Sequence, residues 1–517
     1  MLPETVTLAL GLDDDDDDAS LRKRVAKQLK VDSSELPHLR VLKRSVDARH
    51  KRIRFQLVIG LKKPKSSTLG TPEPKRVTSD RHALIVGAGP AGLFCAYQLA
   101  REGIRCTVLD RGKNVQPRRR DLKKLNQGGI VDTNSNYCFG EGGAGTYSDG
   151  KLYTRSHKRG DVRDVIEILA RHGAPEKILT DARPHIGSNI LPKVITSMRE
   201  LLVECGVNFR FGARVVDLQK NNDRLTGLLL EDGETVSGDA VVLATGHSAS
   251  DVVKMLVDNE IAVEPKAFAL GVRIEHPQRQ INEHQYGKHA SHPKLGAAPY
   301  RLATQVDGRG VFSFCMCPGG WIVPAATEPD AVVVNGMSLS KRDSKFANSG
   351  IVVAIEPEDL KNAGHHDALA GIAMQRAIER AAGSAGGGSL KAPANRAADF
   401  VEKKISANLP DTSYLPGLIP ANLDEVLNAF GVQVAERLRL GLIAFDKKMP
   451  GFLSPEAVLV GVETRTSSPI RVPRHPETLA NQKIQNLFPC GEGAGYAGGI
   501  VSAALDGIRV ARALASQ

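Results

Sequence analysis

The sequence predicts an α/β fold: a Rossmann-like domain, an inserted α+β substrate domain and a small N-terminal α+β domain. Three observations predict it. A glycine-rich turn follows a buried strand at residues 83–86, a β-meander closes on a second buried strand near residue 243, and an uneven charge distribution sets the first 75 residues apart. The 517 residues allow about two to four domains of ordinary size. Hydrophobic residues make up 41% and charged residues 25%, which excludes general disorder.

The N-terminal segment carries the basic excess of the chain. Residues 19–80 hold 17 Lys and Arg against five Asp and Glu, a net charge of +12 in a chain whose total is +11. Such a footprint is one mark of a nucleic-acid-binding module. Residues 1–80 contain a single aromatic, Phe55, so a stacking platform for single strands is lacking. A small domain with a solvated basic face is therefore favoured, and nucleic acid stays a weaker alternative.

The same segment has the pattern of a folded module. Ser20 is a candidate N-cap of a helix with Leu21 and Val25 on its inner face, and the six preceding Asp residues would stabilise its N-terminus. Residues 51–59 alternate between apolar and polar side chains, as in a half-buried strand. Residues 62–74, rich in Pro and Ser, predict a linker.

The seven cysteines argue against zinc and against a disulfide framework, because they are scattered and odd in number. With no secretory signal before the Asp run, we expect a cytoplasmic protein without metal. Cys315 and Cys317 would point to the same face of a strand. Their close spacing makes a disulfide awkward, so buried packing is favoured over a redox role.

A dinucleotide-binding turn begins directly after the linker. The strand Ala83–Val86 leads into Gly87-Ala-Gly89-Pro-Ala-Gly92 and then a helix. Gly87 makes the tight turn, Gly89 lets the backbone approach a pyrophosphate, and Gly92 lets helix and strand pack closely. The helix N-terminus then offers free N–H groups and a positive dipole to the phosphates. The glycines and Pro90 also argue against a membrane span in the uncharged stretch of residues 83–100.

A second strand strengthens this interpretation. Residues 103–110 end in Asp110, eighteen positions after Gly92, where an acid bonds ribose hydroxyls. Residues 207–246 then form the meander and a buried strand that ends in Ala244-Thr245-Gly246. Near the C-terminus, residues 486–502 read as a strand, a glycine-rich loop and a helix.

These segments together resemble the single-Rossmann flavoproteins of the glutathione-reductase superfamily. The runs at 139–152, 314–320, 461–469 and 491–500 are similar to those of the family described as FAD-dependent dehydrogenases or NAD(P)/FAD-dependent oxidoreductases. The resemblance covers almost the whole chain and implies FAD, but it implies no substrate. The loop acid here is Glu492 where the superfamily usually has Asp, which leaves its contact to FAD open.

The resemblance and the first motif together define an expected FAD site. Its residues are Gly87, Ala88, Gly89, Pro90, Ala91, Gly92, Asp110, Arg111, Gly142, Gly143, Ala144, Gly145, Thr146, Ser148, Val215, Ala244, Thr245, Gly246, Gly491, Glu492, Gly498, Gly499 and Ile500.

Five polar residues are candidates for the substrate side of the flavin. Arg273 and Arg465 could hold a substrate carboxylate, and Glu463, His185 or Tyr147 could move a proton. Each has a plainer alternative as a surface ion pair or a satisfied core histidine.

We expect four segments: an N-terminal domain and linker at 1–75, a first part of the FAD domain at 76–258, an inserted substrate domain at 259–455, and a C-terminal FAD part at 456–517. No second nucleotide-binding motif follows a strand, which leaves NAD(P)H as a candidate transient co-substrate. The leading hypothesis is an FAD-dependent oxidoreductase that transfers hydride between flavin and a small organic substrate. The alternatives are an RNA-binding or RNA-modifying flavoprotein and a non-catalytic flavin-binding protein. We expect no membrane partner, and the oligomeric state stays open.

Overall fold

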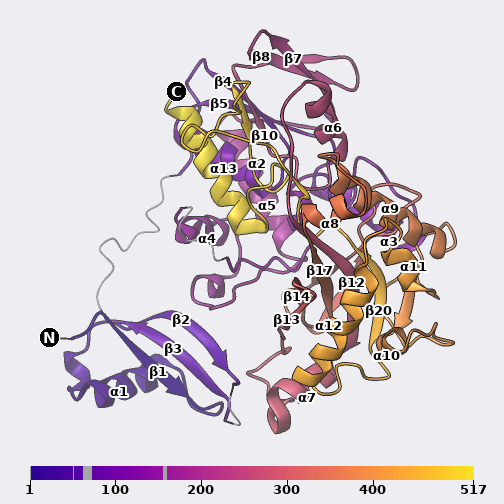
Figure 1. Ribbon diagram of the computed structural model, residues 1–517. Coiled ribbons are helices and arrows are strands. Elements are labelled where there is room, and N and C mark those ends of the chain that lie inside the picture. Colours follow the sequence, from indigo (N-terminus) through magenta and orange to yellow (C-terminus); the bar gives the residue numbers. More distant parts are fainter. Residues whose placement is uncertain (1, 50–51, 62–72, 155–159) are drawn as a thin grey trace.

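The computed structural model describes residues 2–49, 52–61, 73–154 and 160–517. It contains an N-terminal module, a parallel-sheet domain and a domain built on a large mixed sheet (Figure 1). The linker expected at 62–74 lies almost entirely outside the described residues.

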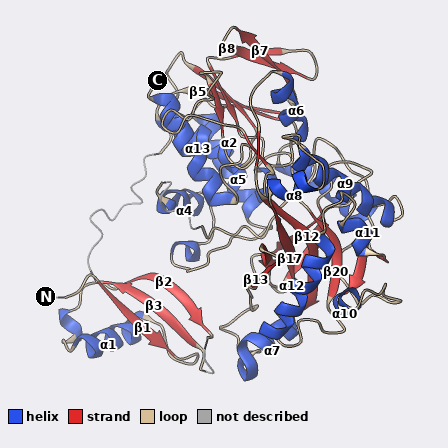
Figure 2. Ribbon diagram, in the orientation of Figure 1, coloured by secondary structure: helices blue, strands red, loops and turns tan. Residues whose placement is uncertain are grey.

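The N-terminal module is a three-stranded antiparallel sheet with one helix (Figure 2). The strands β1 (Thr5–Leu10), β3 (Arg54–Gly60) and β2 (Arg40–Asp47) lie in that order, with α1 (Asp18–Leu29) beside them. The helix begins before Ser20, because the side chain of Asp17 accepts the Ser20 N–H and caps it. Arg44 of β2 joins the module to the rest of the chain through backbone hydrogen bonds with Thr180 and Ala182.

The parallel sheet has the strand order β22-β10-β4-β5-β6. Its strands are β4 (His82–Val86), β5 (Arg105–Asp110), β6 (Asn208–Phe211), β10 (Ala240–Leu243) and β22 (Leu487–Pro489). The β10 and β22 strands lie next to each other although more than 240 residues separate them in the chain. The parallel-sheet domain is therefore assembled from two distant parts of the sequence, as expected for a domain with an insertion.

The two faces of this sheet are covered differently, because alternate side chains point to opposite faces. Ala83 and Ile85 pack in one cluster with the helices, while Leu84 and Val86 pack in another with the meander and α6. The helices are α2 (Pro90–Arg101), α4 (Val162–Arg171), α5 (Leu191–Glu204) and α13 (Ile500–Ala515). The other face carries β7 (Val215–Asn221), β8 (Arg224–Leu230), β9 (Thr235–Ser237) and α6 (Ser250–Asp258).

The second large sheet has the order β13-β14-β17-β12-β20-β18-β19. Its strands are β12 (Phe268–Pro277), β13 (Ala303–Val306), β14 (Arg309–Cys317), β17 (Phe346–Ile355), β18 (Ala392–Arg396), β19 (Leu418–Pro420) and β20 (Val458–Glu463). Two short pairs accompany it: β15 (Gly320–Pro324) with β16 (Val334–Ser338), and β11 (Glu264–Pro265) with β21 (Ile470–Arg471). Because β20 pairs with β12 and β18, this strand belongs to the inserted domain, beyond the boundary expected at residue 455.

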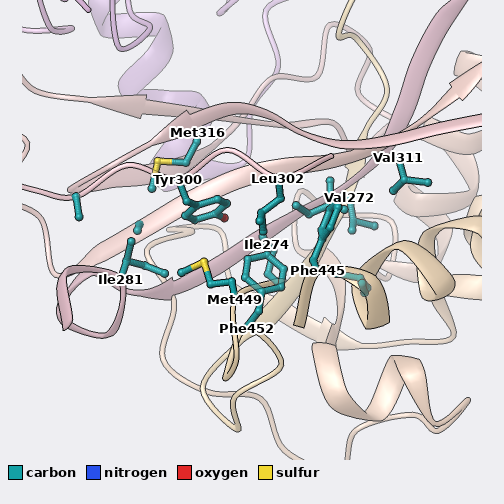
Figure 3. Packing of buried hydrophobic residues seen from close by; sticks show 14 of the residues in the cluster. Val272, Ile274, Ile281, Tyr300, Leu302, Val311, Met316, Phe445, Met449 and Phe452 are labelled. Atoms are coloured by element: carbon teal, nitrogen blue, oxygen red, sulfur yellow. The ribbon is translucent and has the colours of Figure 1, made fainter. Parts of the chain in front are cut away.

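This sheet is surrounded by the helices α7 (Gln278–Tyr286), α8 (Pro357–Asn362), α9 (Ala370–Ala385), α10 (Ala397–Val401), α11 (Leu423–Leu427) and α12 (Val434–Lys448). Phe445 of α12 and Phe452 pack with Val272 and Ile274 of β12 to form its core (Figure 3). The helix α3 (Val115–Gly128) instead lies beside the glycine-rich loop described below. No helix in the described part of the chain has both the length and the apolarity to cross a bilayer.

Candidate functional site: a flavin cavity between the two sheets

The turn after β4 has the geometry that its glycines require. Gly87 adopts φ +105°, and a Cβ on it would lie 2.4 Å from the carbonyl oxygen of Ala244. A Cβ on Gly92 would lie 1.9 Å from the oxygen of Gly87. Asp110 holds the turn, because its carboxylate accepts the Ala88 N–H at 2.8 Å and the Gly112 N–H at 2.8 Å. The protein's own contacts thus fix the conformation of the turn.

Two helix N-termini meet at this turn. The helix α2 begins after Gly89 and α13 begins after Gly499, and no side chain caps either one. The helices pack closely at Gly507, where a Cβ would lie 2.1 Å from the oxygen of Ala91. Each N-terminus therefore offers backbone N–H groups and a positive dipole end to an anion, which suits a pyrophosphate.

The third wall is the glycine-rich loop that contains the short helix η2 (Gly143–Gly145). Arg118 of α3 is fully buried and donates to four carbonyl oxygens along it, those of Asn136, Tyr137, Glu141 and Gly143, at 2.7–3.1 Å. Burial lowers the pKa of this guanidinium, against the attraction of nearby acidic groups. This one side chain, which the sequence analysis did not single out, therefore supports the loop at four points.

These three walls enclose a cavity of about 590 Å³. It runs from Asp110, past both helix N-termini, to Cys315 on β14 and to Arg465 after β20. Gly89 leaves open space here, because a Cβ on it would meet only the Cα of Gly143, at 3.8 Å. The expected site residues that line the cavity are Gly87, Gly89, Pro90, Ala91, Asp110, Arg111, Gly143, Ala144, Gly145, Ser148, Val215, Ala244, Thr245, Gly246, Glu492, Gly498, Gly499 and Ile500.

This cavity fits FAD. Asp110 lies where the adenosine ribose would bind, and the N-termini of α2 and α13 lie where the pyrophosphate would bind. The end near Arg465 and Cys315 would hold the flavin ring. When bound, the flavin accepts or donates a hydride at N5.

Five expected FAD-site residues lie behind the cavity wall. Thr146 donates its hydroxyl to the Glu141 carbonyl, and Gly491 donates its N–H to Asp506. Gly142 donates to the carbonyl of Ala88, and Gly92 packs on Gly87. Ala88, Gly92, Gly142, Thr146 and Gly491 therefore shape the wall, but they do not line the space a ligand would fill.

Glu492 lines the cavity at the N-terminal end of α13, where the superfamily usually has Asp. Burial raises its pKa to about 8, against the attraction of Lys266. Its carboxyl group is therefore largely protonated at neutral pH. In that form it can donate a hydrogen bond as well as accept one.

The substrate-side candidates are paired differently from the expectation. Arg273 is fully buried and makes a bidentate ion pair with Glu463, at 2.5 and 3.1 Å. Arg465 makes its own bidentate pair with Glu379, at 2.7 and 2.9 Å. The reason is the sheet register, which places β12 beside β20 and so brings Arg273 to Glu463. The partner carboxylate of Arg273 is that of Glu463, inside the protein, and Arg273 does not reach the cavity. Arg465 does line the cavity, but its guanidinium is already paired with Glu379.

His185 and Tyr147 also have internal partners. His185 contacts the carbonyl oxygen of Ser340 at 3.2 Å and does not line the flavin cavity. Burial lowers its pKa to about 4. Tyr147 donates its hydroxyl to the carbonyl of Val115 at 2.8 Å. Tyr147 and Glu463 instead line a smaller cavity of about 30 Å³ that adjoins the first.

The structure adds residues that the sequence analysis missed. His247, Asn335 and Gly336 line both cavities, as does the predicted Arg465, so they lie where flavin and substrate would meet. His247 follows directly after the Ala-Thr-Gly segment, and this position is the one feature of the sequence that could have indicated a place in the site. Lys151 and Cys315 line the large cavity. Lys151 directly follows the glycine-rich loop, but its contact with a strand more than 160 residues away has no trace in the sequence pattern.

Comparison with known families agrees with this geometry. Residues 267–466 match the family described as FAD-dependent protein, C-terminal domain-like, and residues 85–140 match the NAD(P)-binding Rossmann-like domain. Residues 164–267 match the pyridine nucleotide-disulphide oxidoreductases, and residues 2–61 match a domain of unknown function.

Whole proteins give two informative matches. A Clostridium beijerinckii protein named only as uncharacterized is 39% identical over 524 residues, covering 97% of this chain and 96% of its own length. The ribosomal RNA dihydrouridine synthase of Escherichia coli is 30% identical over 171 residues, covering 32% of this chain and 39% of its own length. Among solved structures, the crystal structure of CtdE in complex with FAD aligns over 84% of each chain, at 12% identity and a TM-score of 0.33.

The fold and the cavity define a flavoprotein that binds FAD. More particularly, the chain belongs to the family of the NAD(P)/FAD-dependent oxidoreductases, together with the Clostridium beijerinckii protein. Its domains are of the FAD-dependent oxidoreductase type.

Replacement of Gly89 by Asp tests the placement of the pyrophosphate. We expect Gly89→Asp to be purified without flavin, because its carboxylate would enter the space at the α2 N-terminus and repel the phosphates. The ratio of flavin to protein absorbance measures the loss. Gly89→Ala, which adds a Cβ without charge, should retain more flavin than Gly89→Asp. A fully loaded Gly89→Asp protein would contradict the placement.

Replacement of Arg118 by Met tests the support of the glycine-rich loop. Four buried carbonyls would lose their donor, so we expect the free energy of unfolding to fall by at least ~3 kcal/mol. Flavin affinity should fall at least tenfold because the loop loses its position. Arg120→Met, at an exposed position of the same helix, is the matched control. Denaturant unfolding and FAD titration measure both effects, and equal stability of the two variants would refute this role of Arg118.

Proposed function

We propose that the protein transfers a hydride between its flavin and a small organic substrate bound beside the flavin ring. The observation that carries this proposal is the second, smaller cavity, which shares His247, Asn335 and Arg465 with the flavin cavity. A molecule placed there would lie against the ring end of the flavin. At about 30 Å³, the space admits only the reacting portion of a substrate unless neighbouring side chains move.

His247 is the proposed proton acceptor for this transfer. Burial, together with Arg465, lowers its pKa to about 4, so the imidazole is neutral at neutral pH. One ring nitrogen, Nδ1, contacts the Ser248 hydroxyl at 2.8 Å, which orients the ring. As a substrate C–H gives its hydride to the flavin, His247 would take the proton from the adjoining O–H or N–H group. This role replaces those expected for Glu463, His185 and Tyr147.

Arg465 is the proposed positioning group. Its guanidinium is held by Glu379 and by the Thr327 hydroxyl at 2.8 Å. The ion pair with Glu379 raises its pKa against the effect of burial, so it stays charged. A fixed cation beside the flavin ring would attract an electron-rich substrate group and would also favour the negative charge of a reduced flavin.

An anaerobic absorbance spectrum tests the proposal. The purified protein, loaded with FAD, is recorded before and after addition of NADPH or NADH. Rapid bleaching of the flavin band by either nucleotide would support a pyridine-nucleotide-linked reductase in which NAD(P)H docks transiently. A stable band directs the test to a panel of small alcohols, amines and acids, one of which should bleach it. A flavin that no nucleotide and no panel member reduces would refute hydride transfer and favour a non-catalytic flavin-binding protein.

A second candidate is an enzyme that reduces a base in RNA. The specific observation is the partial match to the ribosomal RNA dihydrouridine synthase of Escherichia coli. The basic N-terminal module would supply phosphate contacts through exposed residues such as Lys23, Lys27 and Arg54. These residues are not gathered on one face, since Lys23 and Lys27 lie on α1 while Arg54 belongs to the side of β3 that faces away from the helix.

Salt-dependent RNA binding distinguishes the two candidates. If RNA is the substrate, binding of a structured transcript should weaken steeply with salt, and Ala replacements of Lys23, Lys27 and Arg54 should reduce both affinity and salt slope. Lys447→Ala, an exposed lysine on α12, is the control. Filter binding over a range of salt concentrations measures this. Absent or salt-insensitive binding would eliminate the RNA candidate.

A further inference from the structure

Two thiols lie at the flavin-ring end of the cavity, and the proposed hydride transfer uses neither. Cys315 and Cys317 are at the end of β14, and Cys315 lines the cavity. Between them, Met316 points into the apolar core with Tyr300 (Figure 3). The thiols therefore lie on the polar side of the strand and Met316 on the core side.

The backbone at this point departs from a regular strand. The pairing of β14 with β17 shifts register between Phe314 and Cys317, which marks a β-bulge. Cys315 has φ +45°, a left-handed conformation that costs free energy in a residue with a Cβ. Strain of this kind persists where surrounding structure enforces it and gathers at functional sites. The Cys317 thiol donates to the backbone carbonyl oxygen of Cys315 at 3.2 Å, so it lies against the strained residue.

A single ammonium group serves both thiols. The Nζ of Lys151 lies 3.6 Å from the Sγ of Cys315 and 3.4 Å from the Sγ of Cys317. Asp149 holds this ammonium at 3.1 Å and is itself bound by Arg342 at 2.5 and 3.0 Å. The lysine therefore cannot swing away without breaking its ion pair with the buried Asp149 carboxylate.

This environment distinguishes the two sulfurs. The neighbouring Cys317 side chain and the charges of Lys151 and Arg273 lower the pKa of Cys315 well below its ordinary value, against burial and Asp149. The neighbouring Cys315 side chain and burial raise the pKa of Cys317. The two directions favour the thiolate at Cys315, which lines the cavity, and the thiol at Cys317. The thiols of Cys95, Cys106 and Cys490, by contrast, are fully buried with raised pKa values, as inert core cysteines are.

The spacing permits a disulfide. Two residues apart in an extended strand, Cα atoms are about 6.6–6.8 Å from each other, at the upper end of the range of disulfides, about 4.4–6.8 Å. Both sulfurs lie within 3.6 Å of the same ammonium group, so they lie on the same side of the chain. The resulting bond would be strained, and strained disulfides are the easily reduced, redox-active ones. This reverses the sequence-based preference for plain core packing.

We propose that Cys315 and Cys317 are a redox-active pair that exchanges two electrons with the bound flavin. In the oxidising direction, the Cys315 thiolate and the Cys317 thiol lose two electrons together. The S–S bond forms, the Cys317 S–H bond breaks, the electron pair passes to the oxidised flavin, and the proton goes to flavin N5. The products are one disulfide and one anionic reduced flavin, so charge and electrons balance. Lys151 stays protonated throughout and stabilises the thiolate.

Thiol counting tests the pair independently of activity. The chain has seven cysteines. After oxidation with diamide and unfolding in denaturant, we expect the wild type to show five reactive thiols. Cys315→Ser and Cys317→Ser should each keep all six of their thiols under the same treatment. Cys205→Ser, remote from the cavity, is the matched control and should fall from six to four. A wild type that keeps seven thiols, or a Cys315→Ser protein that still loses two, would overturn the proposal.

An anaerobic dithionite titration tests the exchange with flavin. The diamide-oxidised, FAD-loaded wild type should take up four electrons before the flavin band is fully bleached, and its thiol count should return to seven. Cys315→Ser, loaded to the same flavin absorbance, should take up two. Complete bleaching of the wild type by two electrons, with five thiols remaining, would show that the disulfide does not communicate with the flavin and would overturn the proposal.

The pH dependence of Cys315 alkylation tests the role of Lys151. In Lys151→Met, the pH at which Cys315 reacts with iodoacetamide should shift upward by at least one pH unit, since the thiolate loses its counter-charge. Peptide mass mapping identifies the alkylated residue. An unchanged pH profile in a protein that still binds flavin would overturn the role of this lysine. These outcomes are independent of the substrate, so failure of the proposed hydride transfer would leave this inference standing.

Discussion

The buried guanidinium of Arg118 is the constraint on which the flavin cavity depends. A loop rich in glycine has little preference for one conformation, and its backbone carbonyls would otherwise need water. Arg118 satisfies four of them at once from within the protein. The loop can therefore be both free of side-chain bulk and fixed in place. That combination lets its backbone lie against the α2 N-terminus, with Gly143 close to Gly89.

The second organising feature is the separation of charged pairs from the reacting space. Arg273 forms an ion pair with Glu463, and Arg465 forms one with Glu379. Burying a charged group without a partner costs several kcal/mol, so each cation carries its own carboxylate. The polar groups that remain at the flavin-ring end of the cavity are His247, the paired Arg465, and Cys315 and Cys317 with Lys151. The chemistry we propose uses this set.

The proposed substrate and the proposed dithiol pair would both exchange electrons with the same flavin. A substrate beside His247 would deliver electrons to the flavin, and the Cys315–Cys317 pair would receive them or return them. A flavin site flanked by both would not require a permanently bound second nucleotide. The absence of a second glycine motif after a strand in the sequence is consistent with that arrangement.

The sequence by itself determined the dinucleotide turn, the identity of the cofactor and the two-ended assembly of the FAD domain. The turn follows from local rules: Gly87 and Gly92 have no room for a Cβ, and Asp110 ends the strand that neighbours them. The cofactor and the two-ended assembly follow from the resemblance of the later glycine-rich segments to known flavoproteins. The half-buried strand in the N-terminal module was also correctly predicted, with Phe55 and Leu57 on its buried face. Between α11 and α12 the helical path is interrupted near Gly431, which adopts φ +79°.

Only the tertiary structure decided which polar residues face the flavin. Glu463 and Arg465 are two residues apart in the sequence, yet their partners are Arg273 and Glu379, which reach them across strand and helix packing. Lys151 meets Cys315 and Cys317 for the same reason. A glycine motif is a property of adjacent residues and leaves its pattern in the sequence. An ion pair between distant segments depends on sheet register, and no local pattern encodes it.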